Sequence, residues 1–130
     1  MSFFHAVVWL DHEAAQVLRL RAEGVDAQHV KAHHHNTSQH ASRVRTEHEY
    51  FGMVCDAIAG VNEVLVLGSH TTTADFRHYI DKHRPATSKQ IAGFEISEPL
   101  SEGQLAAFAR SYFDKHDRMA GFSAASRDPA

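Results

Sequence analysis

The segment Glu63–Gly68 (EVLVLG) is an almost continuously apolar run of residues. Such a run is typical of a central strand that is buried on both faces of a sheet. Apolar side chains repeat with helical spacing on either side of it, over 50–58 and again over 72–83. A further strand pattern covers 91–96, and a strongly amphipathic pattern covers 105–113. Because strands that are joined through helices pair in parallel by right-handed crossovers, this half of the chain predicts a parallel sheet.

The first third of the chain has a different pattern, with three short strand-like segments separated by tight turns. The segments are 4–10, 16–22 and 25–33, and Glu23-Gly24 forms the second turn. They predict an antiparallel meander. The whole order, β-β-β-α-β-α-β-α, is that of the ribonuclease-H-like fold. We therefore expect an α/β protein with a mixed five-stranded sheet and three helices.

Two capping boxes set the expected helix starts. Thr46 and Glu49 are spaced to cap the first helix, and Ser101 and Gln104 the last one. The segment before Thr46, residues 34–45, is polar and its apolar residues show no clear helical or strand period, so we expect a loop there.

Size and composition bound the class of protein. The chain has 130 residues, 43% of them hydrophobic, which suits one soluble domain. We expect that domain to cover 1–117, with a flexible tail over 118–130. A single cysteine, Cys55, excludes an intramolecular disulfide and a cysteine-based zinc site. No apolar run approaches the length of a membrane span, so we expect a cytoplasmic protein without membrane contact.

Histidine is unusually abundant, with 12 residues in the chain. The formal net charge is −3 with neutral imidazoles, so the sign of the charge depends on pH. His33, His34 and His35 are adjacent, with His40 nearby. Adjacent residues of an extended strand point to opposite faces, so such a triplet is poorly arranged to hold one metal ion. We predict no metal and no cofactor, while a metal-binding or metal-dependent hydrolase that uses the histidines and Asp11 remains the alternative.

A metal-dependent nuclease would need several carboxylates at the strand ends and on the first helix. Asp11 follows the first strand, and Glu47 or Glu49 would lie on the helix. No acid follows the fourth strand until Asp75. The set is incomplete, which favours a non-catalytic protein in which Asp11 is a turn residue and Glu49 a capping residue.

The turn after the central strand is a weaker candidate site. Gly68, Ser69 and Thr72 lie between a strand and a helix, which is the geometry of an anion-binding turn. It is not a P-loop sequence, and ordinary capping of the helix also explains it.

A long stretch without acidic residues is the best candidate for contact with nucleic acid. No carboxylate occurs from Ala27 to Thr46. A flexible, donor-rich segment of this kind suits a phosphate backbone. The candidate contacts are Lys31, His33, His34, His35, Gln39, His40, Arg43 and Arg45.

A strand ending in Asp (8–11) precedes the first hairpin, and a helix of the type Arg-x-x-x-x-x-His-x-Tyr covers 43–50. A Leu-Val-Leu-Gly strand (65–68) precedes a helix that contains 74–80. This pattern resembles the middle domain of archaeal and eukaryotic class-one peptide chain release factors and of the ribosome-rescue factor Pelota. It is especially similar to small bacterial proteins known as translational machinery proteins. The resemblance covers roughly 4–113 and implies the fold and an association with ribosomal or other RNA.

The sequence departs from release factors at the catalytic loop. Release factors carry Gly-Gly-Gln in that loop, whereas 35–40 reads HNTSQH, in which only Gln39 remains. We therefore expect a non-catalytic, translation-associated module that contacts the ribosome or structured RNA through 33–45, without peptide release. A further alternative is a stress-related protein that acts through protein partners or as a homo-oligomer.

Overall fold

A computed structural model describes residues 3–33 and 40–126. The three meander strands are followed by helices and strands in alternation, and four helices are present in the described part of the chain. The elements are β1 (His5–Leu10), β2 (Ala14–Leu20), β3 (Val25–Lys31), α1 (His40–Ala57), β4 (Glu63–Gly68), α2 (His70–His83), α3 (Pro85–Gln90), β5 (Ile91–Ile96) and α4 (Glu102–Ser126).

The sheet is mixed and five-stranded, in the order β3-β2-β1-β4-β5. β1 pairs antiparallel with β2, and β2 with β3, whereas β4 is parallel to both β1 and β5. Gly24 takes a φ of 99° in the β2–β3 turn, a conformation that a residue without Cβ adopts freely. The predicted α/β fold and its mixed sheet are confirmed.

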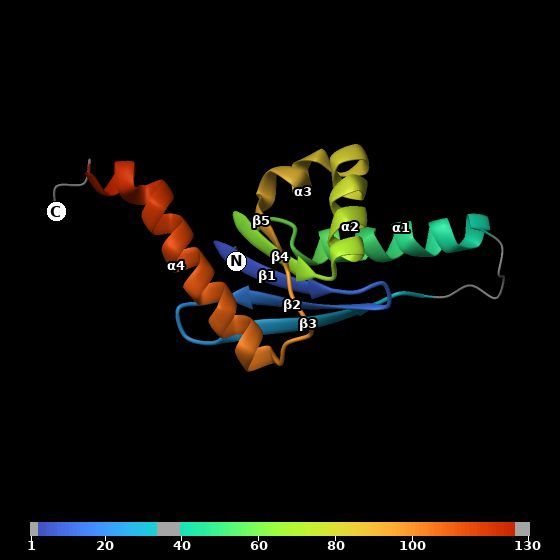
Figure 1. Ribbon diagram of the computed structural model, residues 1–130, viewed down its shortest axis with the longest axis horizontal. Helices are drawn as coiled ribbons and strands as arrows, with labels where there is room; N and C mark the ends of the chain where they lie inside the picture. The colour runs from blue at the N-terminus through green and yellow to red at the C-terminus, as the bar shows by residue number, and fades with distance from the viewer. Residues whose placement is uncertain (1–2, 34–39, 127–130) are drawn as a thin grey trace.

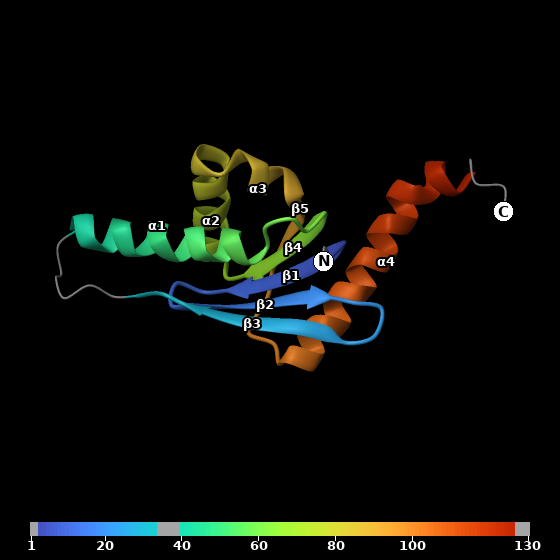
Figure 2. The ribbon, with the colours of Figure 1, turned by 180° about the vertical axis from the view of Figure 1, so that it is seen from behind.

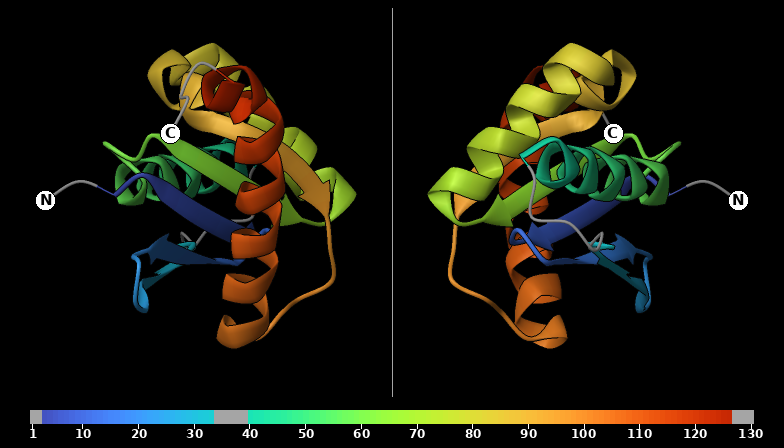
Figure 3. Two further views of the ribbon diagram at one scale, coloured as in Figure 1. Left: turned by 90° about the vertical axis from the view of Figure 1, so that its left-hand side faces the viewer. Right: turned by 90° about the vertical axis from the view of Figure 1, so that its right-hand side faces the viewer.

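Helices cover both faces of the sheet. α1 and α2, with the short α3 next to α2, lie on one face, and α4 crosses the other (Figures 1 and 3). The side chains of β4 alternate between the two cores: Val64 and Val66 pack towards α1 and α2, and Leu65 and Leu67 towards α4. All four are fully buried, which confirms the central-strand interpretation.

The prediction of a loop up to Arg45 is wrong for its last part, because α1 begins at His40. Thr46 therefore lies inside the helix and does not cap its start. It is buried, four residues before Tyr50 and eight before Val54, on the same helical face. Thr46 thus continues the buried face of α1 although it is polar. A search for apolar periodicity therefore misses the first turns of this helix.

The last helix begins as predicted. The amide of Gln104 donates to Ser101 Oγ, and the amide of Ser101 donates to Gln104 Oε1, at 3.2 and 3.0 Å. α4 then continues to Ser126, beyond the point at which we expected a tail, because residues 118–126 contain alanines and no proline. No helix in the described residues, α4 included, is long and apolar enough to cross a membrane.

A helix that the sequence analysis did not predict, α3, follows α2 directly and starts with Pro85. Proline is well suited to the first turn of a helix, because the amide it lacks has no partner there. Pro85 therefore ends α2, as expected, and also begins a further helical turn.

Candidate functional site

The turn at Gly68 and Lys31, the first residue of the predicted RNA contact, lie at the same edge of the sheet. Leu10 pairs with Gly68, and Gly68 pairs with Ile96, so the parallel strands β1, β4 and β5 end together. The antiparallel strands bring Lys31, opposite Ala14, to this edge as well. In open α/β sheets, ligands bind outside the carboxyl ends of the strands. This edge is therefore the candidate functional site.

Positively charged and histidine side chains mark the corner where β3 leads towards α1. Lys31, His33 and Arg45 are exposed. His40 and Arg43 lie in the first turns of α1, whereas His34, His35 and Gln39 fall outside the described residues. Figure 2 shows that α1 extends past the ends of the strands at this corner. We call residues 29–33 and 40–45 the basic corner.

A groove of ≈ 400 Å³ runs between β3 and α1 next to the basic corner. His29, Lys31 and Met53 are among the residues that line it. Its acid, Asp56, is in an ion pair with Arg84 at 3.1 Å. The groove thus adds a partly apolar surface beside the exposed cations.

The turn after β4 is occupied by the helix's own cap. Ser69 Oγ accepts a hydrogen bond from the amide of Thr72 at 3.2 Å and lies 2.8 Å from Thr72 Oγ1. The residue that caps α2 is therefore Ser69. Gly68 precedes it at the end of β4. An anion at this turn would compete with the Ser69 hydroxyl for the Thr72 amide.

The structure also brings together a cluster that the sequence analysis did not predict as a unit. Thr72 Oγ1 lies 3.2 Å from His12 Nδ1, and His12 Nε2 lies 3.3 Å from Asp75 Oδ2. A carboxylate oxygen of Glu47 lies within 4.8 Å of both the His12 and the Asp75 ligand atoms. The Thr72 side chain is fully buried, so its hydroxyl cannot meet a substrate. No sequence spacing connects residues 12, 47 and 75, because the topology alone makes them neighbours.

The acids weighed for a nuclease have distinct positions. Asp11 Oδ1 accepts from the amides of Glu13 and Ala14, both at 2.8 Å, which confirms Asp11 as a turn residue. Glu47 and Asp75 lie beside His12 instead. These two hydrogen bonds use Asp11 Oδ1 to hold its own turn.

Two buried titratable groups of α1 are structural. The Tyr50 hydroxyl donates to the carbonyl of Asp11 at 2.8 Å, and burial raises the pKa of Tyr50. Burial also raises the pKa of the Cys55 thiol, which is 1% exposed. A buried thiol with a raised pKa is a poor nucleophile, which agrees with the interpretation of Cys55 as a core residue.

Comparison with known proteins places the chain in a structural class. No family model matches the sequence, and neither does any curated protein. Solved structures of proteins similar to translation release factors share its fold. Pelota from Archaeoglobus fulgidus matches with a TM-score of 0.65 at 15% identity, over 95% of this chain and 36% of that one.

Two further structures have the same fold. The archaeal translation termination factor aRF1 matches with a TM-score of 0.55 at 13% identity, over 95% of this chain and 41% of that one. Dom34 from S. cerevisiae, a translation termination-like factor involved in RNA quality control, has a TM-score of 0.53 at 8% identity. The match to Dom34 covers 95% of this chain and 38% of Dom34. The chain thus spans well under half the length of these proteins, and the predicted resemblance is confirmed for the fold.

Proposed function

We propose that this chain is a non-catalytic, translation-associated module that binds the ribosome or structured RNA through the basic corner. The observation that carries the proposal is the placement of Lys31, His33 and Arg45. These exposed side chains lie at the sheet edge, at the end of the molecule where α1 extends beyond the strands. The fold shared with Pelota, aRF1 and Dom34 supports a role in translation.

Phosphate is the chemical group that this corner would recognise. The acid-free stretch from Ala27 to Thr46 supplies Lys31, Arg43 and Arg45 as permanent cations. Free imidazole gains charge as the pH falls towards about 6.5, so a histidine-rich segment is a better match for phosphate at lower pH. Cations that approach a nucleic acid release its counterions, so binding of this kind weakens as salt rises. A ribosome partner would place the protein in the cytoplasm.

Peptide release is not part of the proposed function. Release factors use a Gly-Gly-Gln loop, whereas 35–40 contains no glycine. Glycine is the residue that takes positive φ without strain, so a loop without it lacks that conformational freedom. We propose that the corner binds RNA without promoting ester hydrolysis.

Co-sedimentation of the full chain with ribosomes tests the proposal. It is measured at pH 7.5 and pH 6, each over a series of salt concentrations. We expect tighter binding at pH 6. The double variant Arg43→Ala/Arg45→Ala should weaken binding at both pH values and reduce the slope of log affinity against log salt by about 1.5. Replacing His33, His34, His35 and His40 with Gln should remove the pH dependence alone.

A matched control removes the same charge elsewhere. Lys82 and Lys89 are exposed on α2 and α3, away from the corner, so Lys82→Ala/Lys89→Ala should leave ribosome binding unchanged. Absence of binding at low salt would refute the proposal. So would equal losses in the arginine and lysine variants, because these would show only general attraction of charge.

A further inference from the structure

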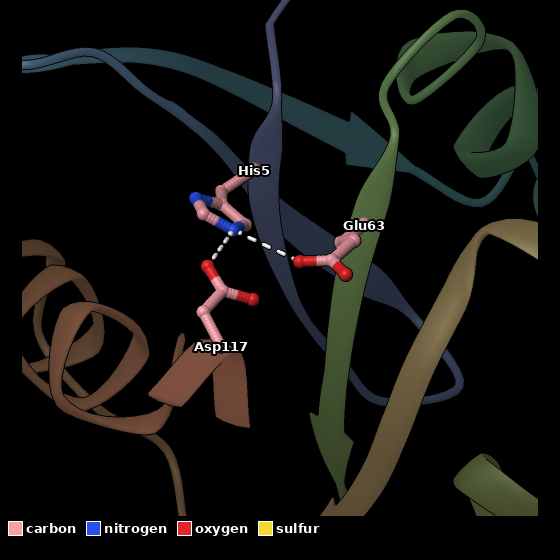
Figure 4. A group of neighbouring side chains, drawn as sticks. All are labelled: His5, Glu63 and Asp117. Carbon is pink, nitrogen blue, oxygen red and sulfur yellow. Dashed lines mark hydrogen bonds and ion pairs between the residues drawn. The ribbon is translucent and has the colours of Figure 1, made fainter. Parts of the chain in front are cut away.

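A second cluster of titratable side chains lies at the opposite edge of the sheet, where β1 and β4 begin. His5 and Glu63 are register partners in these neighbouring strands. His5 Nε2 lies 3.0 Å from Glu63 Oε1 and 3.0 Å from Asp117 Oδ2. Figure 4 shows the three side chains converging from β1, β4 and α4. All three are partly buried, and their ligand atoms lie within 4.8 Å of one another.

A second imidazole adjoins this group. His116 Nε2 lies 3.7 Å from Glu63 Oε2, so Glu63 presents one oxygen to each histidine. Aromatic contacts orient both rings. His5 stacks on Phe113 at 4.1 Å between ring centroids, and His116 stacks on Tyr112 at 5.7 Å. These ring contacts therefore help to hold both imidazoles in place, in addition to their contacts with the carboxylates.

A single hydrogen bond from His5 Nε2 cannot satisfy both carboxylates of this cluster. One imidazole nitrogen carries at most one N–H, yet two carboxylate oxygens lie 3.0 Å from His5 Nε2. The two carboxylate oxygens lie within 4.8 Å of each other, a separation at which two negative charges repel. A divalent cation between them would neutralise the cluster.

We propose that His5, Glu63 and Asp117 form a three-residue binding site for a divalent transition metal, with zinc the best fit. Imidazole nitrogen and carboxylate oxygen bind zinc at 2.0–2.2 Å, which sets neighbouring ligands of a tetrahedral site about 3.4 Å apart. The separation of 3.0 Å between His5 Nε2 and each carboxylate oxygen is slightly shorter than that value, and all three ligand atoms lie within 4.8 Å of one another. Calcium and magnesium prefer oxygen ligands alone, so an imidazole ligand favours zinc over either.

The cluster beside the basic corner is the weaker candidate for a metal. His12 and Asp75 are half-exposed there, so water competes for their ligand atoms. In contrast, the His5 side chain is only 23% exposed and its Nε2 faces the carboxylates.

The metal site would have a structural consequence. Asp117 belongs to α4, whereas His5 and Glu63 belong to the sheet. A shared ion would therefore attach the second half of α4 to the starts of β1 and β4. This role does not depend on RNA binding, because the site lies at the edge opposite the basic corner.

Zinc titration of the metal-free full chain tests the proposal. Because the histidines at 33, 34, 35 and 40 would bind metal on their own, the titration uses a background in which they are replaced with Gln. We expect one zinc per chain and a rise in Tm of about 5 °C or more at saturating zinc. Glu63→Gln/Asp117→Asn should weaken zinc binding by about tenfold or more and abolish the Tm shift.

Two control variants locate the site. Asp114→Asn changes an exposed acid on the same helix, which is paired with Arg118, and should leave zinc affinity unchanged. His12→Gln/Asp75→Asn tests the other cluster and should also have no effect. The circular dichroism spectrum of the metal-free variants shows whether each one folds. No zinc binding in the background, or binding that is lost with His12 and Asp75 but kept without Glu63 and Asp117, would overturn the proposal.

Discussion

Gly68 occupies a position that tolerates no side chain. It pairs with Leu10 at the end of β4, immediately before the cap of α2. A Cβ at this position would collide with the carbonyl oxygen of Leu10 and press on the methyl group of Thr73. Since backbone atoms of paired strands cannot move apart without breaking the ladder, the close approach requires glycine.

Gly68→Ala should therefore destabilise the protein. We expect the free energy of unfolding in urea to fall by about 1–3 kcal/mol, the usual cost of overpacking. Gly103→Ala is the matched control, because a Cβ at Gly103 meets nothing within 4 Å and alanine is the better helix former. Equal stability of the two variants would show that the strand ends move apart easily.

Tyr50 couples stability to pH at the alkaline end. Its hydroxyl is buried and bonded to Asp11, and burial raises its pKa above the value of about 10 in an unfolded chain. A raised pKa means that the stabilisation is complete below pH 10 and is lost as pH rises through the folded pKa.

The free energy of unfolding should consequently fall above pH 10, by up to about 1.4 kcal/mol per pH unit for this one group. Tyr50→Phe should be less stable than the original protein at pH 8, because the Asp11 carbonyl loses its donor. The difference should narrow by pH 11, as measured by urea unfolding across this range. A difference that stays constant with pH would contradict the assignment.

At the scale of elements, the start of α1 determines how the basic corner is presented. With the helix beginning at His40, Arg43 and Arg45 have helical positions. Arg45 is exposed and lies at the sixth position of the helix, so its amide belongs to the regular hydrogen-bond ladder.

Arg45→Pro distinguishes the two possible starts. If α1 begins at His40, proline at position 45 interrupts the helix and should cost about 3 kcal/mol in the free energy of unfolding. If the helix began at Thr46, proline would fall before it and cost little. Arg45→Ala provides the control for loss of the side chain, and it should unfold at the same urea concentration as the original protein.

At the scale of the whole molecule, the sheet is a layer between two separate cores. One core is covered by α1 and α2, and the other by α4, through Leu105, Ala109 and Phe113. Figure 3 shows α4 crossing its face of the sheet alone. The stability of the domain should thus depend on α4 as much as on the two helices opposite.

Phe113→Ala tests this dependence. Phe113 is 2% exposed in the second core, so its truncation should cost about 3–5 kcal/mol in the free energy of unfolding. Phe108 lies on the same helix but is 40% exposed, and Phe108→Ala should cost clearly less. Similar small losses in both variants, in urea melts followed by circular dichroism, would mean that α4 contributes little to the fold.

The sequence alone determined the elements whose signals are local. The apolar run of β4, the glycine turn at Gly24 and the capping box at Ser101 all depend on neighbouring residues, so they could be read from the printed order. The start of α1 could not, because Thr46 is buried only by virtue of what packs against it.

Only the tertiary structure decided which polar side chains meet. His5, Glu63 and Asp117 come from the first strand, the fourth strand and the last helix. His12, Glu47 and Asp75 are just as far apart in the chain. The physical reason is that parallel pairing of β1 with β4 aligns their ends, and helix packing then adds a third residue. The composition shows that histidines are abundant, but the order of the strands determines which of them lie next to carboxylates.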